Sequence, residues 1–211
     1  MAGALTAGLD VARVRDDSAF AVLEAWRSKQ VLIHLAAWKP QREDCADVLL
    51  PVVDWLDRNQ GNAATRVAID GRKRTGEAVV DGAVSGALGQ RADVYALLPS
   101  HSDAPHLQRP DGWIYVGKDP LVRGLRDGLE RGDLLVAPDL PLADAFRREL
   151  GRMVRIPTRR AMGTTWSHPD QRKGSHDDMT MAAAYAYWLA YTITAHGQAV
   201  RPLCRAHGGT E

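Results

Sequence analysis

The sequence contains few cysteines and no long apolar run. Cys45 and Cys204 are its only cysteines, and they do not form a Cys-x-x-Cys pair. This excludes a disulfide framework and a structural zinc site built from cysteine ligands, so we expect buried or incidental thiols. No apolar run approaches the about 20 residues that span a bilayer, and the first residues lack the basic region of a secretory signal. The expected location is the cytoplasm, away from membranes.

The sequence also lacks a large excess of charge of either sign. Its formal net charge is +1, but the distribution of charge along the chain matters more for a nucleic-acid partner than the total does. Two stretches are strongly basic, although solvated loops are the common fate of such runs. The basic residues in them are Arg72, Lys73 and Arg74 in the first, and Arg155, Arg159, Arg160, Arg172 and Lys173 in the second.

The pattern of apolar residues predicts a single α/β domain over residues 1–211, without repeats or linkers. Three β-rich runs joined by short polar connections predict an antiparallel meander. Alternating helical and strand-like runs then predict strands that add to the meander in parallel. The predicted strands cover residues 5–14, 18–26, 30–38, 65–70 and 92–98, and the predicted helices cover 41–59 and 75–88.

The second half of the sequence continues with shorter elements. Its last helix is apolar nearly all round, which predicts that this helix is buried. The elements predicted in order are a polar loop over 99–111, a short strand over 113–116, helices over 120–131 and 142–150, a strand over 152–156, a basic loop over 157–174 and a helix over 175–195.

Four aspartates occupy positions where chemistry is expected. Asp10 lies inside the first strand, where a charge costs free energy unless it is paired. Asp70 ends the buried strand TRVAID, and ligands collect at the carboxyl ends of parallel strands. Asp177 and Asp178 open the last helix. Because the first and fourth strands are neighbours in this order, we expect the four carboxylates to converge.

Converging carboxylates repel one another, and proteins commonly place a divalent cation among them. Oxygen ligands favour Mg²⁺ or Mn²⁺ over zinc. Two such ions about 3.5–4 Å apart can activate a water and stabilise the attacking and leaving oxygens of a phosphodiester. The acids therefore predict a two-metal site that hydrolyses a nucleic-acid backbone.

An ordinary structural role also fits each acid taken alone. Asp10 fits a strand end, and Asp70 fits the start of a turn before Gly71. Asp177 and Asp178 fit the first turn of a helix, where the helix macrodipole favours negative charge. Only the combination of the acids with this order of strands and helices favours a metal site.

Four segments resemble successive parts of the nuclease domain of the tailed-phage terminase large subunit: LDVARVRDDSAFAVL, VAIDGRKRTGEAVVDGAV, VGKDPLVRGLRDGLERGDLLVAPDLPLADAFRREL and KGSHDDMTMAAAYAYWLA. The Ser-His-Asp-Asp run is the most specific of these. The resemblance implies a ribonuclease-H-like mixed sheet, in which the three-strand antiparallel meander is extended by parallel strands and flanked by helices. It also implies an endonuclease that cleaves concatemeric double-stranded phage DNA during genome packaging, in the cytoplasm of the host cell.

By matching segments, the resemblance assigns the catalytic and metal-binding roles to Asp10, Asp70, Asp177 and Asp178. We favour Asp178 as the primary ligand of the last pair, with Asp177 as a second ligand or an outer residue. For His176, orientation of a water, contact with a phosphate and helix capping all remain open. The residues expected to reach the DNA backbone are Arg72, Lys73, Arg74, Arg159, Arg160, Arg172 and Lys173.

A complete terminase large subunit carries an ATPase motor before its nuclease, and we expect no ATPase domain in this chain. The segment Gly112–Asp119 has the spacing of a phosphate-binding loop, but Asp119 replaces the Ser or Thr that binds Mg²⁺. We therefore expect the motor on another chain or segment, or a stand-alone nuclease. The motor, the portal and the small terminase subunit are the expected protein partners.

Two other functions remain compatible with these residues. Another ribonuclease-H-like nuclease, such as a junction resolvase, would use the same acids on a differently shaped substrate. A catalytically silent DNA-binding packaging module would use the acids only as caps and turns, and it would bind DNA without metal-dependent cleavage.

Overall fold

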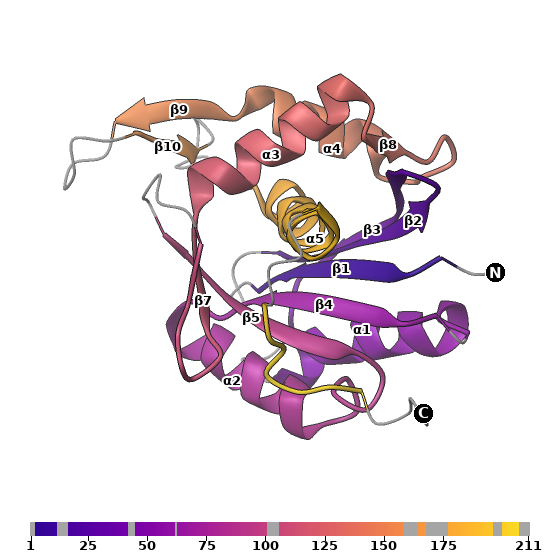
Figure 1. Ribbon diagram of the computed structural model, residues 1–211, viewed down its shortest axis with the longest axis vertical. Helices are drawn as coiled ribbons and strands as arrows, with labels where there is room; N and C mark the ends of the chain where they lie inside the picture. Colours follow the sequence, from indigo (N-terminus) through magenta and orange to yellow (C-terminus); the bar gives the residue numbers. More distant parts are fainter. Residues whose placement is uncertain are drawn as a thin grey trace.

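A mixed β-sheet forms the centre of the computed structural model (Figure 1). The structure describes residues 3–11, 17–41, 45–61, 63–100, 106–157, 164–167, 177–195 and 200–206. Within these residues the sheet has eight strands in the order β6-β7-β5-β4-β1-β2-β3-β8. The strands are β1 (Leu5–Asp10), β2 (Ser18–Trp26), β3 (Lys29–Trp38), β4 (Thr65–Asp70), β5 (Asp93–Ser100), β6 (Leu107–Gln108), β7 (Ile114–Gly117) and β8 (Leu134–Val136).

The pairing of the strands confirms the predicted topology. Strands β1, β2 and β3 form the antiparallel meander, and β4 adds in parallel to β1. Strands β5 and β7 continue the sheet in parallel beyond β4, while β8 adds in parallel to β3 at the other edge. Strand β1 therefore lies in the middle of the sheet, where every backbone group on both sides can be paired.

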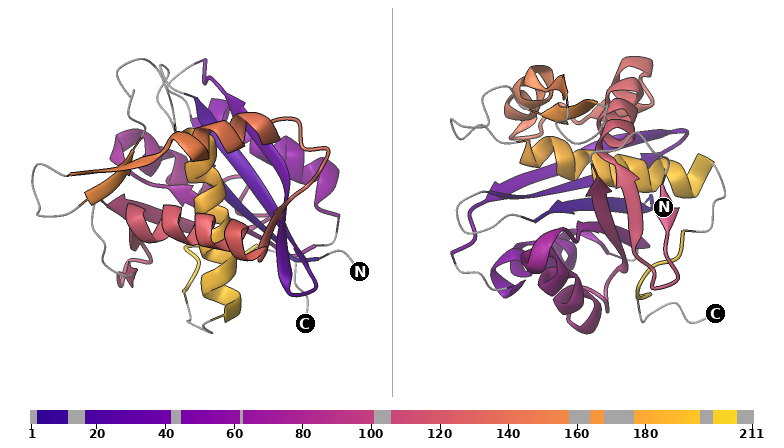
Figure 2. Two further views of the ribbon diagram at one scale, coloured as in Figure 1. Left: turned by 90° about the horizontal axis from the view of Figure 1, so that it is seen from above. Right: turned by 90° about the vertical axis from the view of Figure 1, so that its left-hand side faces the viewer.

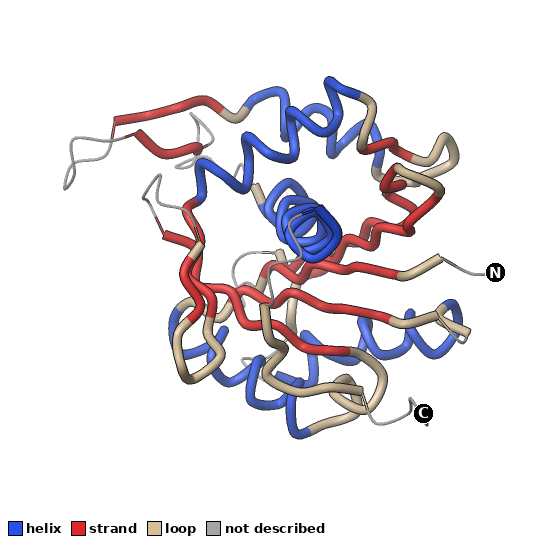
Figure 3. Tube along the Cα trace, in the orientation of Figure 1, coloured by secondary structure: helices blue, strands red, loops and turns tan. Residues whose placement is uncertain are grey.

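Helices cover both faces of the sheet (Figures 1 and 3). Helices α1 (Cys45–Asn59) and α2 (Lys73–Ser85) cover one face. Helix α5 (Asp178–Ala195) packs on the other face against β1 and β2, and α3 (Lys118–Arg131) and α4 (Ala143–Arg152) lie over α5 (Figure 2). Helix α5 is thus buried between the sheet and two other helices, as its continuous apolar sequence predicts.

Successive side chains of a strand point to opposite faces of the sheet, and this alternation decides which side chains of the central strands face α5. In β1, Leu5, Ala7 and Leu9 belong to the core under α1 and α2. The intervening residues of β1, ending with Asp10, therefore point towards α5. Strand β4 follows the same rule, because Val67 and Ile69 belong to the α1 and α2 side while Ala68 belongs to the α5 side. The last residue of each strand is an aspartate, and both aspartates therefore lie on the α5 face of the sheet.

The predicted basic loop over 157–174 is wrong in part. A second sheet pairs β9 (Val154–Pro157) with β10 (Thr164–Ser167) in antiparallel register. The β-branched and aromatic residues of β10 favour this pairing, and its Trp166 lies under the guanidinium of Arg126 at 4.4 Å. The predicted loop over 99–111 likewise contains β6, which pairs with β7. The last helix begins at Asp178. Its predicted start, Ser175, lies outside the described residues.

Cys45 and Cys204 are both free and partly buried. None of the described helices combines the length and the apolar character needed to cross a bilayer.

Candidate metal centre

Asp10 and Asp70 end two adjacent parallel strands. The register pairs Leu9 of β1 with Ile69 of β4, so the next residues of the two strands are the two aspartates. Both are buried, with exposed fractions of 7% for Asp10 and 2% for Asp70. Two carboxylates side by side in the interior repel each other and require compensating positive charge.

Asp177 and Asp178 lie at the start of α5, which points at the same end of the sheet. The backbone carbonyl of Asp177 accepts the first helical hydrogen bond, from the amide of Met181 at 2.8 Å, and Asp178 is the first residue of the helix. Burial raises the pKa of Asp10 well above its ordinary value, and the nearby charges of Asp70, Asp178 and Asp177 raise it further. The structure thus brings the four predicted aspartates into one electrostatic neighbourhood, which we call the acidic cluster.

Arg72 holds Asp70 from the solvent side. Its Nε lies 2.9 Å from Oδ2 of Asp70 and 3.1 Å from Oδ1, its terminal nitrogen lies 2.6 Å from Oδ2, and its backbone amide donates to Oδ1 at 2.8 Å. Burial lowers the pKa of Arg72, but Tyr185 and the hydrogen bonds to Asp70 outweigh this effect and raise it above its ordinary value. The guanidinium therefore stays charged and neutralises Asp70.

Lys118 is a second cation of the acidic cluster, and sequence reasoning missed it. It begins α3, and its Nζ donates a hydrogen bond to Oδ2 of Asp177. A signal was present in the sequence, because Lys118 follows the carboxyl end of the parallel strand β7. The phosphate-loop spacing over residues 112–119 belongs to a segment whose interior is the strand β7.

Two further buried groups border the acidic cluster. The hydroxyl of Tyr185 donates to Oδ2 of Asp70 at 3.3 Å, and burial together with Asp70 and Asp10 raises the pKa of Tyr185 well above its ordinary value. Glu149 of α4 accepts the backbone amide of Thr180 at 2.6 Å, and burial raises its pKa to about 7. Tyr185 lies two helical turns after Asp178, a spacing that places both on one face of α5.

The donor chemistry of the acidic cluster fits a hard divalent cation, because its groups are carboxylate oxygens in a buried setting. Within the described part of the chain, no three His, Cys, Asp or Glu side chains are already gathered around a common point where an ion could bind. In this arrangement Arg72 holds Asp70 and Lys118 holds Asp177. A bound metal ion would therefore draw carboxylate oxygens away from these two cations.

Most of the predicted DNA contacts cannot be placed. Arg159, Arg160, Arg172, Lys173 and His176 lie outside the described residues. Lys73 and Arg74 form the first turn of α2, directly after Asp70 and Arg72, but their side chains lie outside the description too.

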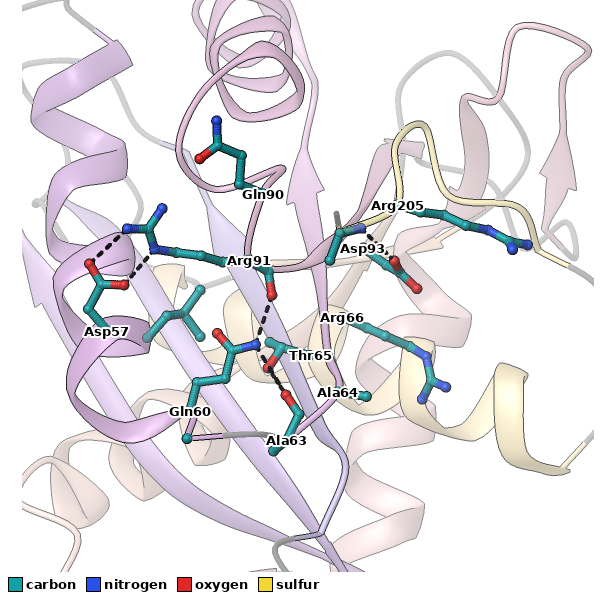
Figure 4. A pocket seen from close by; sticks show the side chains of 13 residues that line it. Asp57, Gln60, Ala63, Ala64, Thr65, Arg66, Gln90, Arg91, Asp93 and Arg205 are labelled. Carbon is teal, nitrogen blue, oxygen red and sulfur yellow. Dashed lines mark hydrogen bonds and ion pairs between the residues drawn. The ribbon is translucent and has the colours of Figure 1, made fainter. Parts of the chain in front are cut away.

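A cleft of about 850 Å³ lies elsewhere (Figure 4). Its lining includes Thr65 and Asp93, the first residues of β4 and β5, together with Arg66, Arg91 and Arg205. Since β4 rises about 3.3 Å per residue, this cleft is on the order of 17 Å from Asp70. The cleft and the acidic cluster therefore lie at different places in the fold. We take the acidic cluster as the candidate site, because its carboxylates are the groups that can bind a metal ion.

A meander extended by parallel strands, with acids at the ends of its first and fourth strands and at the start of a helix on one face, defines the ribonuclease-H-like fold class. No protein-family model and no curated protein matches the chain. Solved structures do match it.

Terminase nucleases share this fold. The large terminase nuclease of the thermophilic phage G20c is 18% identical with a TM-score of 0.52, over 88% of this chain and 81% of that one. The human cytomegalovirus terminase nuclease domain, soaked with Mn and inhibitor-bound, is 15% identical with a TM-score of 0.56, over 92% and 86%. The large terminase nuclease domain of bacteriophage SPP1, with bound Mn, is 14% identical with a TM-score of 0.51, over 89% and 86%.

A longer protein matches as well. The large terminase of a further thermophilic bacteriophage has a TM-score of 0.57 at 10% identity, and the match covers 91% of this chain but only 40% of that one. The chain therefore has the fold of terminase nuclease domains, which confirms the predicted resemblance at the level of fold.

Proposed function

We propose that this chain is a divalent-metal-dependent endonuclease that cleaves double-stranded DNA, acting on concatemeric phage DNA during genome packaging. The observation that carries the proposal is the acidic cluster of Asp10, Asp70, Asp177 and Asp178, built on adjacent parallel strands and the start of α5. Support comes from the fold that the chain shares with terminase nucleases, two of which were solved with Mn.

The acidic cluster would hold Mg²⁺ or Mn²⁺. When bound, such ions polarise a phosphodiester and lower the pKa of a water that attacks it in line. Asp10 and Asp70 are the buried carboxylates on the sheet side, and Asp178 and Asp177 face them from α5. Tyr185 orients Asp70 through its hydrogen bond to Oδ2.

Arg72 is placed to serve the substrate. Its side chain is 35% exposed while its guanidinium is bound to the buried Asp70. A guanidinium offers parallel donors that match phosphate geometry. If Asp70 bound a metal ion, the guanidinium of Arg72 would be free to contact the DNA backbone beside the cleaved bond.

The wider assembly is also part of the proposal. Because the match to a complete large terminase covers 40% of that protein, we expect the chain to work beside an ATPase motor, whether on the same or on another polypeptide. The portal and the small terminase subunit would be its further partners.

Plasmid cleavage tests the function directly. The purified chain is incubated with supercoiled plasmid in Mn²⁺, Mg²⁺ or EDTA, and the wild type is compared with Asp70→Asn. We expect nicking and linearisation that require metal, and a loss of at least about 100-fold in Asp70→Asn, since a direct ligand should matter at least as much as the residues that orient ligands. Asp81→Asn, on the exposed face of α2, is the matched control and should cleave as the wild type does.

Two outcomes would contradict the proposal. Cleavage undiminished in Asp70→Asn would place the active site elsewhere. DNA binding without cleavage in any metal would favour the silent packaging module, an alternative supported by Arg72 and Lys118 already neutralising two of the carboxylates. Selective cleavage of four-way junctions would instead favour a resolvase.

A further inference from the structure

Lys118 is a buried cation inside the acidic cluster. Its side chain is 9% exposed, and its ammonium is bound to Asp177. Burial of an ammonium costs considerable free energy unless an opposite charge compensates for it. Asp177 supplies that charge, and Asp177 also acts electrostatically on Asp10. Lys118 is therefore part of the same electrostatic unit as the predicted metal ligands.

The backbone around Lys118 is anchored on both sides. Before it, β7 pairs in parallel with β5 up to Gly117. After it, the buried carboxylate of Asp119 accepts a hydrogen bond from Nε1 of Trp166 at 2.9 Å and forms an ion pair with Arg155 at 3.0 Å. These contacts hold the start of α3 in place, so the ammonium of Lys118 is a fixed component of the acidic cluster and unlike that of a mobile surface lysine.

The balance of charge in the acidic cluster suits one divalent ion. The four aspartates carry up to four negative charges, and Arg72 and Lys118 carry two positive charges. At most two negative charges are left, which one divalent ion neutralises, and the raised pKa of Asp10 can only reduce that number in the metal-free protein. Glu149 borders the cluster and interacts with Asp177, but burial raises its pKa to about 7, so it adds less than a full charge at neutral pH.

We propose that Lys118 is a built-in cation that competes with a divalent metal ion for Asp177. The four aspartates alone would carry enough negative charge for two divalent ions, but with Lys118 in place the DNA-free chain binds only one. This inference rests on the proposed nuclease function. A phosphate of bound DNA adds the negative charge that a second ion needs, because like charges in a buried site must be balanced. Completion of a two-metal site then depends on the substrate, which restrains cleavage in its absence.

A purely structural role for Lys118 makes a different prediction. The Lys118–Asp177 pair joins α3 to α5, and these helices pack against each other. If the pair served only this packing, then Lys118→Met would change the stability of the fold and leave the number of bound ions unchanged.

Binding of Mn²⁺ alone to the full chain, without DNA, distinguishes the two. Isothermal titration calorimetry gives the stoichiometry, and the electron paramagnetic resonance signal of free Mn²⁺ gives an independent count. The variants are Lys118→Met, which removes the charge, and Lys118→Arg, which keeps it. Lys29→Met is the matched control, because Lys29 lies beside Gly132 at the other end of α3, on the order of 20 Å away along the helix.

We expect one bound Mn²⁺ for the wild type, Lys118→Arg and Lys29→Met. For Lys118→Met up to three negative charges are left, more than one divalent ion neutralises, so we expect the first Mn²⁺ to bind about tenfold more tightly and a second, weaker Mn²⁺ site to appear. The wild-type count tests the inference even if Lys118→Met does not fold, since the inference requires a single ion there.

Two bound ions in the wild type would overturn the inference, as would a folded Lys118→Met with unchanged stoichiometry and affinity. Both results leave the nuclease proposal intact, because plasmid cleavage tests that separately. Absence of Mn²⁺ binding in every variant would overturn the inference and the metal-dependent function together.

Discussion

At the scale of single residues, the acidic cluster shows how one buried charge depends on its partner. Asp70 is buried, and three donors reach its oxygens: the guanidinium and the backbone amide of Arg72, and the hydroxyl of Tyr185. Only the guanidinium carries a positive charge. Loss of this one group should therefore leave a buried carboxylate hydrogen-bonded but not neutralised.

We predict that Arg72→Met destabilises the metal-free protein. Breaking a fully buried pair costs about 3–5 kcal/mol, and the partial exposure of Arg72 together with the two remaining donors reduces this to roughly 2 kcal/mol. Urea unfolding in EDTA measures the change. The double variant Asp70→Asn, Arg72→Met should recover most of the loss because no buried charge remains. An Arg72→Met variant as stable as the wild type would mean that Arg72 does not compensate Asp70.

The sequence alone identified the four aspartates, because their positions at strand ends and at a helix start could be read without the structure. It indicates that Lys118 follows the end of a strand, but not that Lys118 contacts Asp177. That contact joins residues 59 positions apart, and it depends on where β7 pairs in the sheet. The metal-binding role of the aspartates stays a prediction, as do the DNA contacts of Arg159, Arg160, Arg172 and Lys173.

At the scale of elements, the contact between β1 and α5 brings the aspartates at the strand ends close to the aspartates at the start of α5. Gly8 lies in the middle of β1, facing α5. A Cβ atom at Gly8 would lie 2.7 Å from the backbone nitrogen of Ala186 and would clash with the carbonyl oxygen of Ala182. Backbone atoms of a buried helix cannot yield as a flexible side chain can. The run of small residues in α5 and the glycine in β1 together allow the close approach.

We predict that Gly8→Ala destabilises the fold by roughly 3 kcal/mol, at the upper end of the cost of overpacking a core. Thermal unfolding measures it. Gly124→Ala is the matched control: Gly124 lies in α3 with no neighbour near its missing Cβ, so alanine there should stabilise the helix by about 0.5–1 kcal/mol. Equal stability of Gly8→Ala and wild type would mean that α5 can move away from β1.

The strand order could be predicted from the sequence because local runs and chain connectivity determine it, as in the meander and the parallel addition of β4. The β9–β10 pair could not be. Its strands are only four residues each, and part of their stability comes from Asp119 and Arg126 on α3, which contact Trp166. The strands β9 and β10 are short, are flanked by basic residues and are stabilised by residues far away in the sequence. Their local sequence pattern is therefore that of a loop.

At the scale of the whole molecule, the two ends of the sheet differ in their charged groups. The acidic cluster lies at the carboxyl ends of β1 and β4, whereas the cleft at the amino ends of β4 and β5 is lined by three arginines and two aspartates, of which Asp57 forms an ion pair with Arg91. Buried acids with raised pKa values lie only at the first end among the described residues. The dependence of stability on pH should therefore report on the acidic cluster and its border, together with His34, whose pKa burial lowers from 6.5.

The last prediction concerns that pH dependence. The pKa of Glu149 rises on folding from 4.5 to about 7 because of burial, so between these values the folded chain binds a proton that the unfolded chain releases. Stability must then fall as pH rises through this window. The raised pKa of Asp10 acts in the same direction above its ordinary value of 3.8. For the metal-free protein we expect a loss of roughly 2 kcal/mol between pH 5 and pH 8, or about 4–8 °C in Tm.

Glu149→Gln should flatten this profile and raise the Tm at pH 8, because glutamine keeps an acceptor for the amide of Thr180 without the buried charge. Glu130→Gln, at an exposed position of α3, should not change the profile. Mn²⁺ should stabilise the protein most at pH 8, where the carboxylates that bind it are ionised. The lowered pKa of His34 acts in the opposite direction below pH 6.5. Stability that rises from pH 5 to pH 8 without metal would mean that this effect outweighs those of Glu149 and Asp10, and it would contradict the argument.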